Sequence, residues 1–299
     1  MHHSERRGIL LALCGFALLS VGDAVIKTMA GEWSPLAVAS VRFAIGATGL
    51  SALLAMTEGP KAFRPANPRL QFVRGVCLAA ASLMFFSAIF VMPLATAMAL
   101  AFVAPVIVAV LSGPLLSEKV RPAVWLASII ALVGVALVLR PNLSALGLVA
   151  LLPLASAFFF ALMVIANRAS AGQGSALSMQ VFMQVGAMPV LLLAALGGHF
   201  SGVEALEVTM PDWTIIARCA VVAVTASSAH WLVYMGTQRA GASTIAPTTY
   251  VQMLVATSLG WWWFGDVPDL MTLVGAAVII GAGLILWWST PRGPSANSR

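Results

Sequence analysis

Charged side chains are scarce in this sequence of 299 residues. Asp, Glu, Lys and Arg together make up 9% of it, whereas apolar residues make up 61%. A soluble protein of this size has about 25% charged residues to cover its surface. The composition therefore excludes a water-soluble globular fold and indicates that lipid is the solvent. The net charge of +6 does not predict a nucleic-acid partner, because the basic residues flank long apolar runs and report on topology instead.

Cysteine and the residues of catalytic or metal sites are equally scarce. The three cysteines, Cys14, Cys77 and Cys219, lie in or beside apolar runs without the spacing of a metal site, so we expect them to be small packing residues. There are four histidines, two of them at the N-terminus, and no HExxH, G-x-S-x-G, P-loop or nucleotide-binding glycine motif. We therefore predict no enzyme activity, no catalytic residue, no cofactor and no metal.

The sequence is instead rich in apolar runs of about 20 residues, the length that crosses a bilayer as a helix. Pro, Gly and charged residues separate the runs, and the first one has no A-x-A cleavage site, so we expect it to remain as an anchor. The predicted fold is an all-α membrane protein with ten transmembrane helices. They are expected at roughly 8–29, 35–57, 70–92, 95–116, 120–139, 146–167, 177–197, 213–237, 243–264 and 269–289.

The placement of charge gives the orientation of these helices. With a cytoplasmic N-terminus, all of the 16 Lys and Arg residues except Lys27, Arg42, Arg140 and Arg218 fall in segments on the cytoplasmic side. Most of the acidic residues fall on the other side. This asymmetry follows the positive-inside rule, so both termini are predicted to be cytoplasmic.

Two stretches, Ser82–Glu118 and His230–Asp266, resemble one another at a shift of about 148 residues. Each of the two halves of the chain then contains five spans, an odd number, so the second half enters the membrane with the opposite orientation. Such inverted repeats are typical of transporters. We expect a first five-helix repeat at 1–141, an inverted second repeat at 142–290 and a cytoplasmic tail at 291–299. The shift places Ser82 on His230, Phe86 on Tyr234, Phe102 on Tyr250 and Glu118 on Asp266.

Three segments carry a resemblance to a known family: the turn and helix PLATAMALAFVAP, the acidic end LLSEK, and its counterpart WWWFGD. With its two five-helix halves, the chain resembles the EamA-type members of the drug/metabolite transporter (DMT) superfamily. It is most similar to bacterial amino-acid exporters, including the YddG-type exporters of aromatic amino acids. The resemblance implies an inner ring formed by the third, fourth, eighth and ninth helices around a central cavity, with the fifth and tenth outermost.

Polar and aromatic side chains that suit a cavity recur in the third, eighth and ninth expected helices. Ser82 and Phe86, like His230 and Tyr234, are four residues apart and share a helix face. His230 is the only histidine deep within a span; it can relay a proton, bind a substrate carboxylate or form an interhelical hydrogen bond. Single phenylalanines can equally be core or lipid contacts. The predicted substrate-binding residues are Ser82, Phe86, Phe102, His230, Tyr234, Thr248, Tyr250 and Gln252.

Three charged residues fall inside the first two spans. Because a lone charge in the bilayer costs several kcal/mol, we expect Asp23 to pair with Arg42 and Lys27 to extend toward the outer surface. The pair either fixes the register of the helices or forms an outer gate or a point of proton coupling. Pro105 and Pro247, inside two spans, are expected hinges.

Neutral hydrogen-bonding groups with aromatic walls suit a zwitterionic or aromatic small molecule better than a polyanion. We therefore predict a secondary-active transporter of the bacterial inner membrane that exports aromatic or neutral amino acids, or related small metabolites, by alternating access. Protons are the candidate coupling ion. The alternatives are a carrier for drugs or other metabolites, and a membrane receptor or assembly subunit that binds without transport. A monomer suffices, because both halves lie in one chain.

Overall fold

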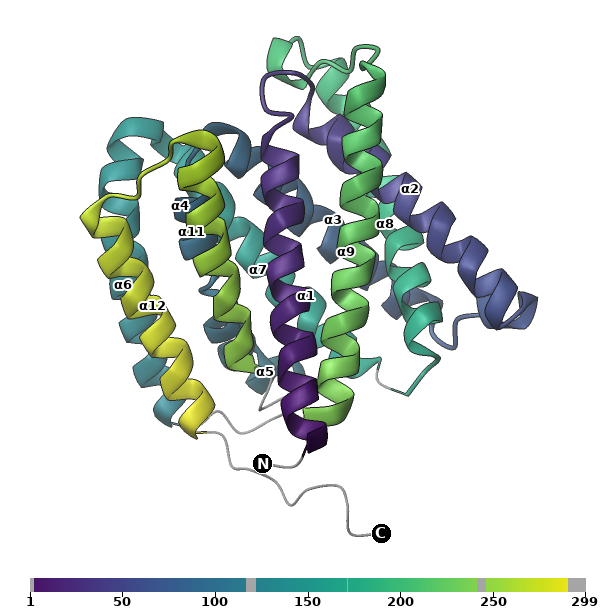
Figure 1. The fold of residues 1–299 in the computed structure, drawn as a ribbon, viewed down its shortest axis with the longest axis horizontal. Helices are drawn as coiled ribbons and strands as arrows, with labels where there is room; N and C mark the ends of the chain where they lie inside the picture. The colour runs from purple at the N-terminus through teal and green to yellow at the C-terminus, as the bar shows by residue number, and fades with distance from the viewer. Residues whose placement is uncertain (1–2, 117–121, 171, 241–245, 290–299) are drawn as a thin grey trace.

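The computed structural model describes residues 3–116, 122–170, 172–240 and 246–289 (Figure 1). In these segments the secondary structure consists of helices joined by turns and loops, with no strand, so the all-α prediction is confirmed for them. Glu118 and the expected tail lie outside the described residues. The helices are α1 (His3–Lys27), α2 (Pro35–Thr57), α3 (Pro68–Val91), α4 (Leu94–Ala101), α5 (Ala104–Leu116), α6 (Pro122–Leu146), α7 (Leu152–Ala169), α8 (Ala176–His199), α9 (Trp213–Ala240), α11 (Val251–Phe264) and α12 (Leu270–Ser289), with short 3-10 turns η1 (Pro60–Phe63), η2 (Gly147–Leu151), η3 (Glu204–Leu206) and η4 (Ala246–Tyr250).

Six helical stretches in the described part of the chain are long and apolar enough to cross a membrane by themselves. They coincide with the first, second, third, sixth, seventh and eighth expected spans. Three shorter apolar helical stretches, Leu94–Val108, Trp125–Leu139 and Leu270–Ile285, coincide with the fourth, fifth and tenth. The expected ninth span corresponds to η4 followed by α11. The six long stretches are Arg6–Lys27, Pro35–Thr57, Pro68–Val91, Gly147–Ala169, Ala176–His199 and Trp213–Gly236.

The expected helix 95–116 is interrupted, which corrects the prediction of one continuous span. α4 ends at Ala101, and α5 begins at Ala104 after a turn at Phe102 and Val103. The interruption has a physical cause, because Pro105 has no N–H to donate to the carbonyl of Ala101, whereas a proline is tolerated in the first turn of a new helix. In the second half, η4 contains Pro247 and passes directly into α11.

Small residues bring the helices close together, as is common in membranes. In the contact between α1 and α9, a Cβ added at Gly15 would lie 2.8 Å from the carbonyl oxygen of Ala229. In the contact between α6 and α12, a Cβ at Gly134 would lie 2.8 Å from the carbonyl oxygen of Gly275. In the contact between α3 and α8, a Cβ at Gly75 would lie 2.6 Å from the backbone nitrogen of Ala187. These glycines therefore fix the register of three helix pairs.

The arrangement places α4 deep in the molecule and α6 with α12 at one edge (Figure 1). In α4, Leu94, Ala97, Ala99 and Leu100 are fully buried. α1 packs against α9 and α11, while α3 packs against α7 and α8. The start of α1 and the ends of α9 and α12 lie at the lower end of Figure 1, and the α1–α2, α8–α9 and α11–α12 connections lie at the upper end. We use "lower end" and "upper end" in this sense below.

Candidate functional site

A cavity of about 510 Å³ lies among α2, α3, α7, α8 and α9. Its position follows from the ends of the elements that form it: the C-terminal end of α7, the N-terminal end of α8, and the connection between them. Small ligands are bound in cavities of about 300 to 1,000 Å³ that combine apolar walls with a few polar groups. The lining residues are Leu50, Arg74, Asn167, Ser170, Gly172, Gly174, Ala176, Leu177, Met179, Gln180, Ser227, His230, Trp231 and Tyr234.

One wall of the cavity is a face of α9. Ser227, His230, Trp231 and Tyr234 lie three or four residues apart, or directly adjacent, and so share this face of the helix. The structure thus brings together His230 and Tyr234, the two residues predicted from the second repeat. The sequence did not point to Trp231, which adds an indole to the same wall and is about half exposed.

The lining also contains Arg74 of α3, which the charge pattern of the sequence placed only among the cytoplasmic basic residues. Its side chain is buried, at 4% exposure. Arg74 Nε donates to Asn167 Oδ1 at 2.5 Å on α7, and Nη1 donates to Gln71 Oε1 on its own helix. Nη1 also lies 3.4 Å from the carbonyl oxygen of Met179 on α8. The signal that could have found this residue is its position within an apolar run, without an acidic residue one helical turn away.

Six of the predicted substrate-binding residues do not line this cavity: Ser82, Phe86, Phe102, Thr248, Tyr250 and Gln252. Phe86 and Phe102 belong to the buried core, the alternative that the sequence left open for single phenylalanines. The Tyr250 ring packs edge-on against Phe102, with centroids 5.7 Å apart, and its hydroxyl fills the space beside Gly283. Gln252 contributes its backbone carbonyl, which accepts from Ser20 Oγ at 3.0 Å.

The predicted ion pair between Asp23 and Arg42 is wrong in its direct form. No ion pair joins these two side chains among the described residues, and Arg42 Nε is buried without a hydrogen-bond partner. The guanidinium instead lies over two aromatic rings, 4.4 Å from the centroid of Phe43 and 5.6 Å from that of Phe86, in a cation–π arrangement. Asp23 lies in α1 and Arg42 in α2, and neither lines the cavity.

Lys27, which we expected to extend toward the outer surface, is the last residue of α1, next to the α1–α2 connection at the upper end. Its ammonium pairs with the carboxylate of Asp266 and also donates to the carbonyl oxygen of Met92 at 3.2 Å. The turn after α11 explains why the pair forms. Gly265 adopts a left-handed conformation with φ of 68°, and Asp266 N then donates to the Gly260 carbonyl at 3.0 Å. This turn directs the carboxylate back toward the end of α1.

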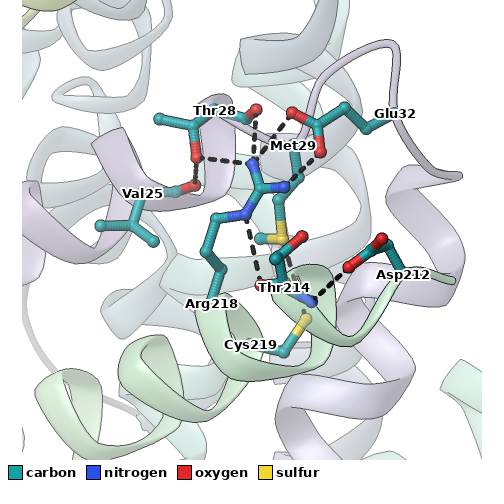
Figure 2. A network of polar contacts seen from close by, with 8 residues as sticks. All are labelled: Val25, Thr28, Met29, Glu32, Asp212, Thr214, Arg218 and Cys219. Carbon is teal, nitrogen blue, oxygen red and sulfur yellow. Dashed lines mark hydrogen bonds and ion pairs between the residues drawn. The ribbon is translucent and has the colours of Figure 1, made fainter.

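A second polar network joins α1 to α9 at the upper end (Figure 2). Arg218 forms an ion pair with Glu32 and donates to the carbonyl oxygen of Thr28 at 3.0 Å. The guanidinium of Arg218 holds the pKa of the Glu32 carboxyl below its usual range. Asp212 accepts from the backbone N–H of Thr214 at 2.8 Å, which lowers the pKa of its carboxyl.

Together with the pair of Lys27 and Asp266, this network links the end of α1 to α9 and to the turn after α11. We call these two ion pairs the upper clasp. By helix rise, Arg218 is about 18 Å along α9 from His230, so the clasp and the cavity lie at different depths.

Comparison with known proteins identifies a family whose model matches this chain. The model of the EamA-like transporter family matches residues 6–140 and 147–288. The chain is similar to the pseudopaline exporter of Pseudomonas aeruginosa, with 26% identity over 282 residues, 94% of this chain and 96% of that protein. It is also similar to the S-adenosylmethionine uptake transporter of Rickettsia prowazekii, with 21% identity over 295 residues, 97% of this chain and 95% of that protein.

The chain is also similar to a third transporter and to a solved structure. The riboflavin transporter of Vibrio cholerae is 27% identical over 207 residues, which cover 67% of this chain and 65% of that protein. A solved crystal structure matches 93% of this chain and 96% of its own with a TM-score of 0.62 at 19% identity, which shows a shared fold.

Proposed function

Because the chain belongs to the EamA-like transporter family of the DMT superfamily, we propose that it exports amino acids or related small metabolites across the bacterial inner membrane by alternating access. The family and the relatives named above are transporters, so the prediction of a membrane transporter rather than an enzyme is confirmed. The observation that carries the finer proposal is the cavity of about 510 Å³ with aromatic and polar walls, which lies at a different depth from the two ion pairs of the upper clasp.

The proposed ten-span inverted repeat is supported by two independent observations. The family model matches the chain twice, once in each expected half. Helix contacts also occur in pairs related by five spans: α3 packs on α7 as α9 packs on α1, and α3 packs on α8 as α9 packs on α2. A twofold relation between the halves accounts for such pairs. It also accounts for the contact between Phe102 and Tyr250, which are equivalent under the shift and lie next to the two helix interruptions.

The proposed state is one in which the cavity communicates with the cytoplasm. The cavity lies toward the lower end, where Arg6, Arg7 and Arg239 are exposed; by the positive-inside rule this end is cytoplasmic. The upper clasp ties α1 to α9 and to the end of α11 on the opposite side. Export then requires the clasp to open while the lower end closes. Pro105 and Pro247, beside the two interruptions, remain the proposed hinges.

The proposed cargo follows from the cavity walls. The indole of Trp231 and the phenol of Tyr234 offer stacking surfaces, and Asn167, Gln180 and Ser227 offer neutral hydrogen-bonding groups. Such a lining suits a small molecule with an apolar or aromatic part. The relatives carry pseudopaline, S-adenosylmethionine and riboflavin according to their names, so cargo varies widely within the family and must be tested directly.

Counterflow in proteoliposomes tests this proposal. Vesicles loaded with unlabelled amino acids are assayed for uptake of labelled tryptophan, phenylalanine, threonine and a neutral drug. We expect uptake of an amino acid that is lost in His230→Ala and Tyr234→Ala, because both side chains line the cavity. The control is Trp125→Ala on α6, which removes an exposed aromatic ring outside the cavity. Uptake of the drug alone would reassign the cargo, and binding without flux would favour a receptor.

A further inference from the structure

Arg74 is a charged residue that lines the cavity and is nevertheless buried. It lies in α3, about 9 Å along the helix from Pro68 by helix rise, and its side chain is only 4% exposed. No acidic side chain among the described residues forms an ion pair with it. A buried charge in a membrane protein is expensive unless it is paired, and such residues commonly mark substrate pathways. The charge of Arg74 therefore requires an explanation beyond packing.

The hydrogen bonds of Arg74 leave part of the guanidinium uncommitted. A guanidinium carries five N–H donors in a planar fork. Nε donates to Asn167, and Nη1 donates to Gln71 and faces the Met179 carbonyl. Nη2 has only the thioether sulfur of Met183, at 3.9 Å, which is a weak acceptor. One nitrogen of the fork therefore lacks an oxygen acceptor.

The neighbouring backbone holds this guanidinium in place. Gly75, the next residue, packs so closely against Gly186 and Ala187 of α8 that a Cβ would lie 2.6 Å from Ala187 N. Asn167 fixes Nε from α7. The side chain is thus oriented from two other helices before any ligand enters, which is the condition for selective binding at low entropic cost.

We propose that Arg74 is the carboxylate-binding group of the cavity and that the cargo is a small molecule carrying a carboxylate and an apolar or aromatic part. Arg74 is the only cation among the lining residues of the described cavity, while Trp231 and Tyr234 lie on the wall formed by α9. A carboxylate in the cavity would neutralise the buried charge of Arg74 through a charge-assisted hydrogen bond to the guanidinium. The apolar part then lies toward α9. This inference rests on the proposed function for its biological meaning, but the binding it requires can be measured without flux.

The test measures binding to the purified full-length protein by thermal shift, using tryptophan and phenylalanine with their carboxamides as probes. We expect the wild type to bind each acid at least about tenfold more tightly than its amide, which is the size of effect that one hydrogen bond to a charged group gives. Arg74→Gln should abolish this preference, and Arg74→Lys should retain part of it. The matched control is Arg69→Gln, an exposed arginine on the same helix, which should retain it fully.

The outcomes separate this inference from the transport proposal. A wild type that binds acid and amide equally, or binds neither, overturns the role of Arg74, as does an Arg74→Gln variant that keeps the preference. The comparison of acid with amide in the wild type needs no variant, so it survives any folding defect in Arg74→Gln. Preferential binding of the acids without flux in liposomes leaves the carboxylate site standing and removes the transporter assignment of the cargo. Equal flux of acid and amide would instead remove the carboxylate site and leave the transport proposal standing.

Discussion

Breaking the ion pair between Lys27 and Asp266 should open the upper end of the protein. The side chains of Lys27 and Asp266 are 11% and 21% exposed, so this ion pair is intermediate between an exposed and a fully buried one. Exposed ion pairs contribute 0 to about 1 kcal/mol to stability, and disruption of a buried pair costs about 3 to 5 kcal/mol. In Asp266→Asn the ammonium of Lys27 keeps the Met92 carbonyl at 3.2 Å and the Phe264 ring at 4.9 Å. We therefore expect a loss of about 2 kcal/mol from the closed state, which changes the ratio of closed to open molecules about 30-fold.

Cysteine accessibility measures this change. Ser20 on α1 is fully buried and donates to the Gln252 carbonyl of α11 at 3.0 Å, about 10 Å below Lys27 along the helix. In a background without Cys14, Cys77 and Cys219, Ser20→Cys should react with a membrane-impermeant maleimide from the periplasmic side about tenfold faster or more once Asp266→Asn is added. The charge exchange Lys27→Asp with Asp266→Lys should restore slow labelling.

The control for this experiment is Glu207→Gln, which removes an exposed acid between α8 and α9. It should leave the rate of labelling unchanged. If Asp266→Asn labels no faster than this control, the ion pair does not hold the upper end closed, and the gate must lie elsewhere.

Three further outcomes follow from particular contacts. Gly75→Ala should lower the melting temperature of the purified protein, with an overpacking cost of about 1 to 3 kcal/mol, whereas Gly49→Ala, where a Cβ meets nothing within 4 Å, should not. Tyr250→Phe should transport with a KM within about twofold of wild type, because Tyr250 packs on Phe102 and Gly283 rather than on the cavity; a large rise in KM would place the tyrosine on the substrate path. Because the folded-state pKa of Glu32 is lowered from 4.5, its contribution to stability is present above pH 4.5 and is lost as the pH falls through the lowered value. Thermal melts should thus show that the wild type is more stable than Glu32→Gln at neutral pH and that this difference in stability is lost on acidification. The difference should be below about 1 kcal/mol, because the Glu32 side chain is 47% exposed. An equal difference at neutral and low pH would contradict the pairing.

The sequence was sufficient for the class of fold because membrane spans depend on length and hydropathy, both of which are local. Arg6–Lys27 and Trp213–Gly236 are long enough to be recognised in isolation. The interruption beside Phe102 was less visible, because apolar residues continue through it and only Pro105 marks it. Periodicity also could not separate Phe86 in the core from Tyr234 on the cavity wall, which the expected repeat places at equivalent positions.

Side-chain pairing was beyond sequence reasoning, because it depends on how helices rotate and on how turns direct a single residue. Asp23 and Arg42 were expected to pair because both fall inside spans, but the guanidinium lies on Phe43 and Phe86 instead. The partner of Lys27 comes from 239 residues away, through the turn at Gly265. The role of Arg74 likewise requires α3, α7 and α8 to meet, which no local pattern records.

Transport of an amino acid is tested by trans-stimulated flux through the reconstituted wild-type protein, with binding measured on the same preparation. We expect that efflux of labelled tryptophan or phenylalanine from loaded proteoliposomes rises when unlabelled amino acid is added outside, exceeds that of protein-free vesicles, and is lost in His230→Ala. Specific binding at the cavity without any trans-stimulated flux would contradict it, and would make the protein a receptor built on a transporter fold.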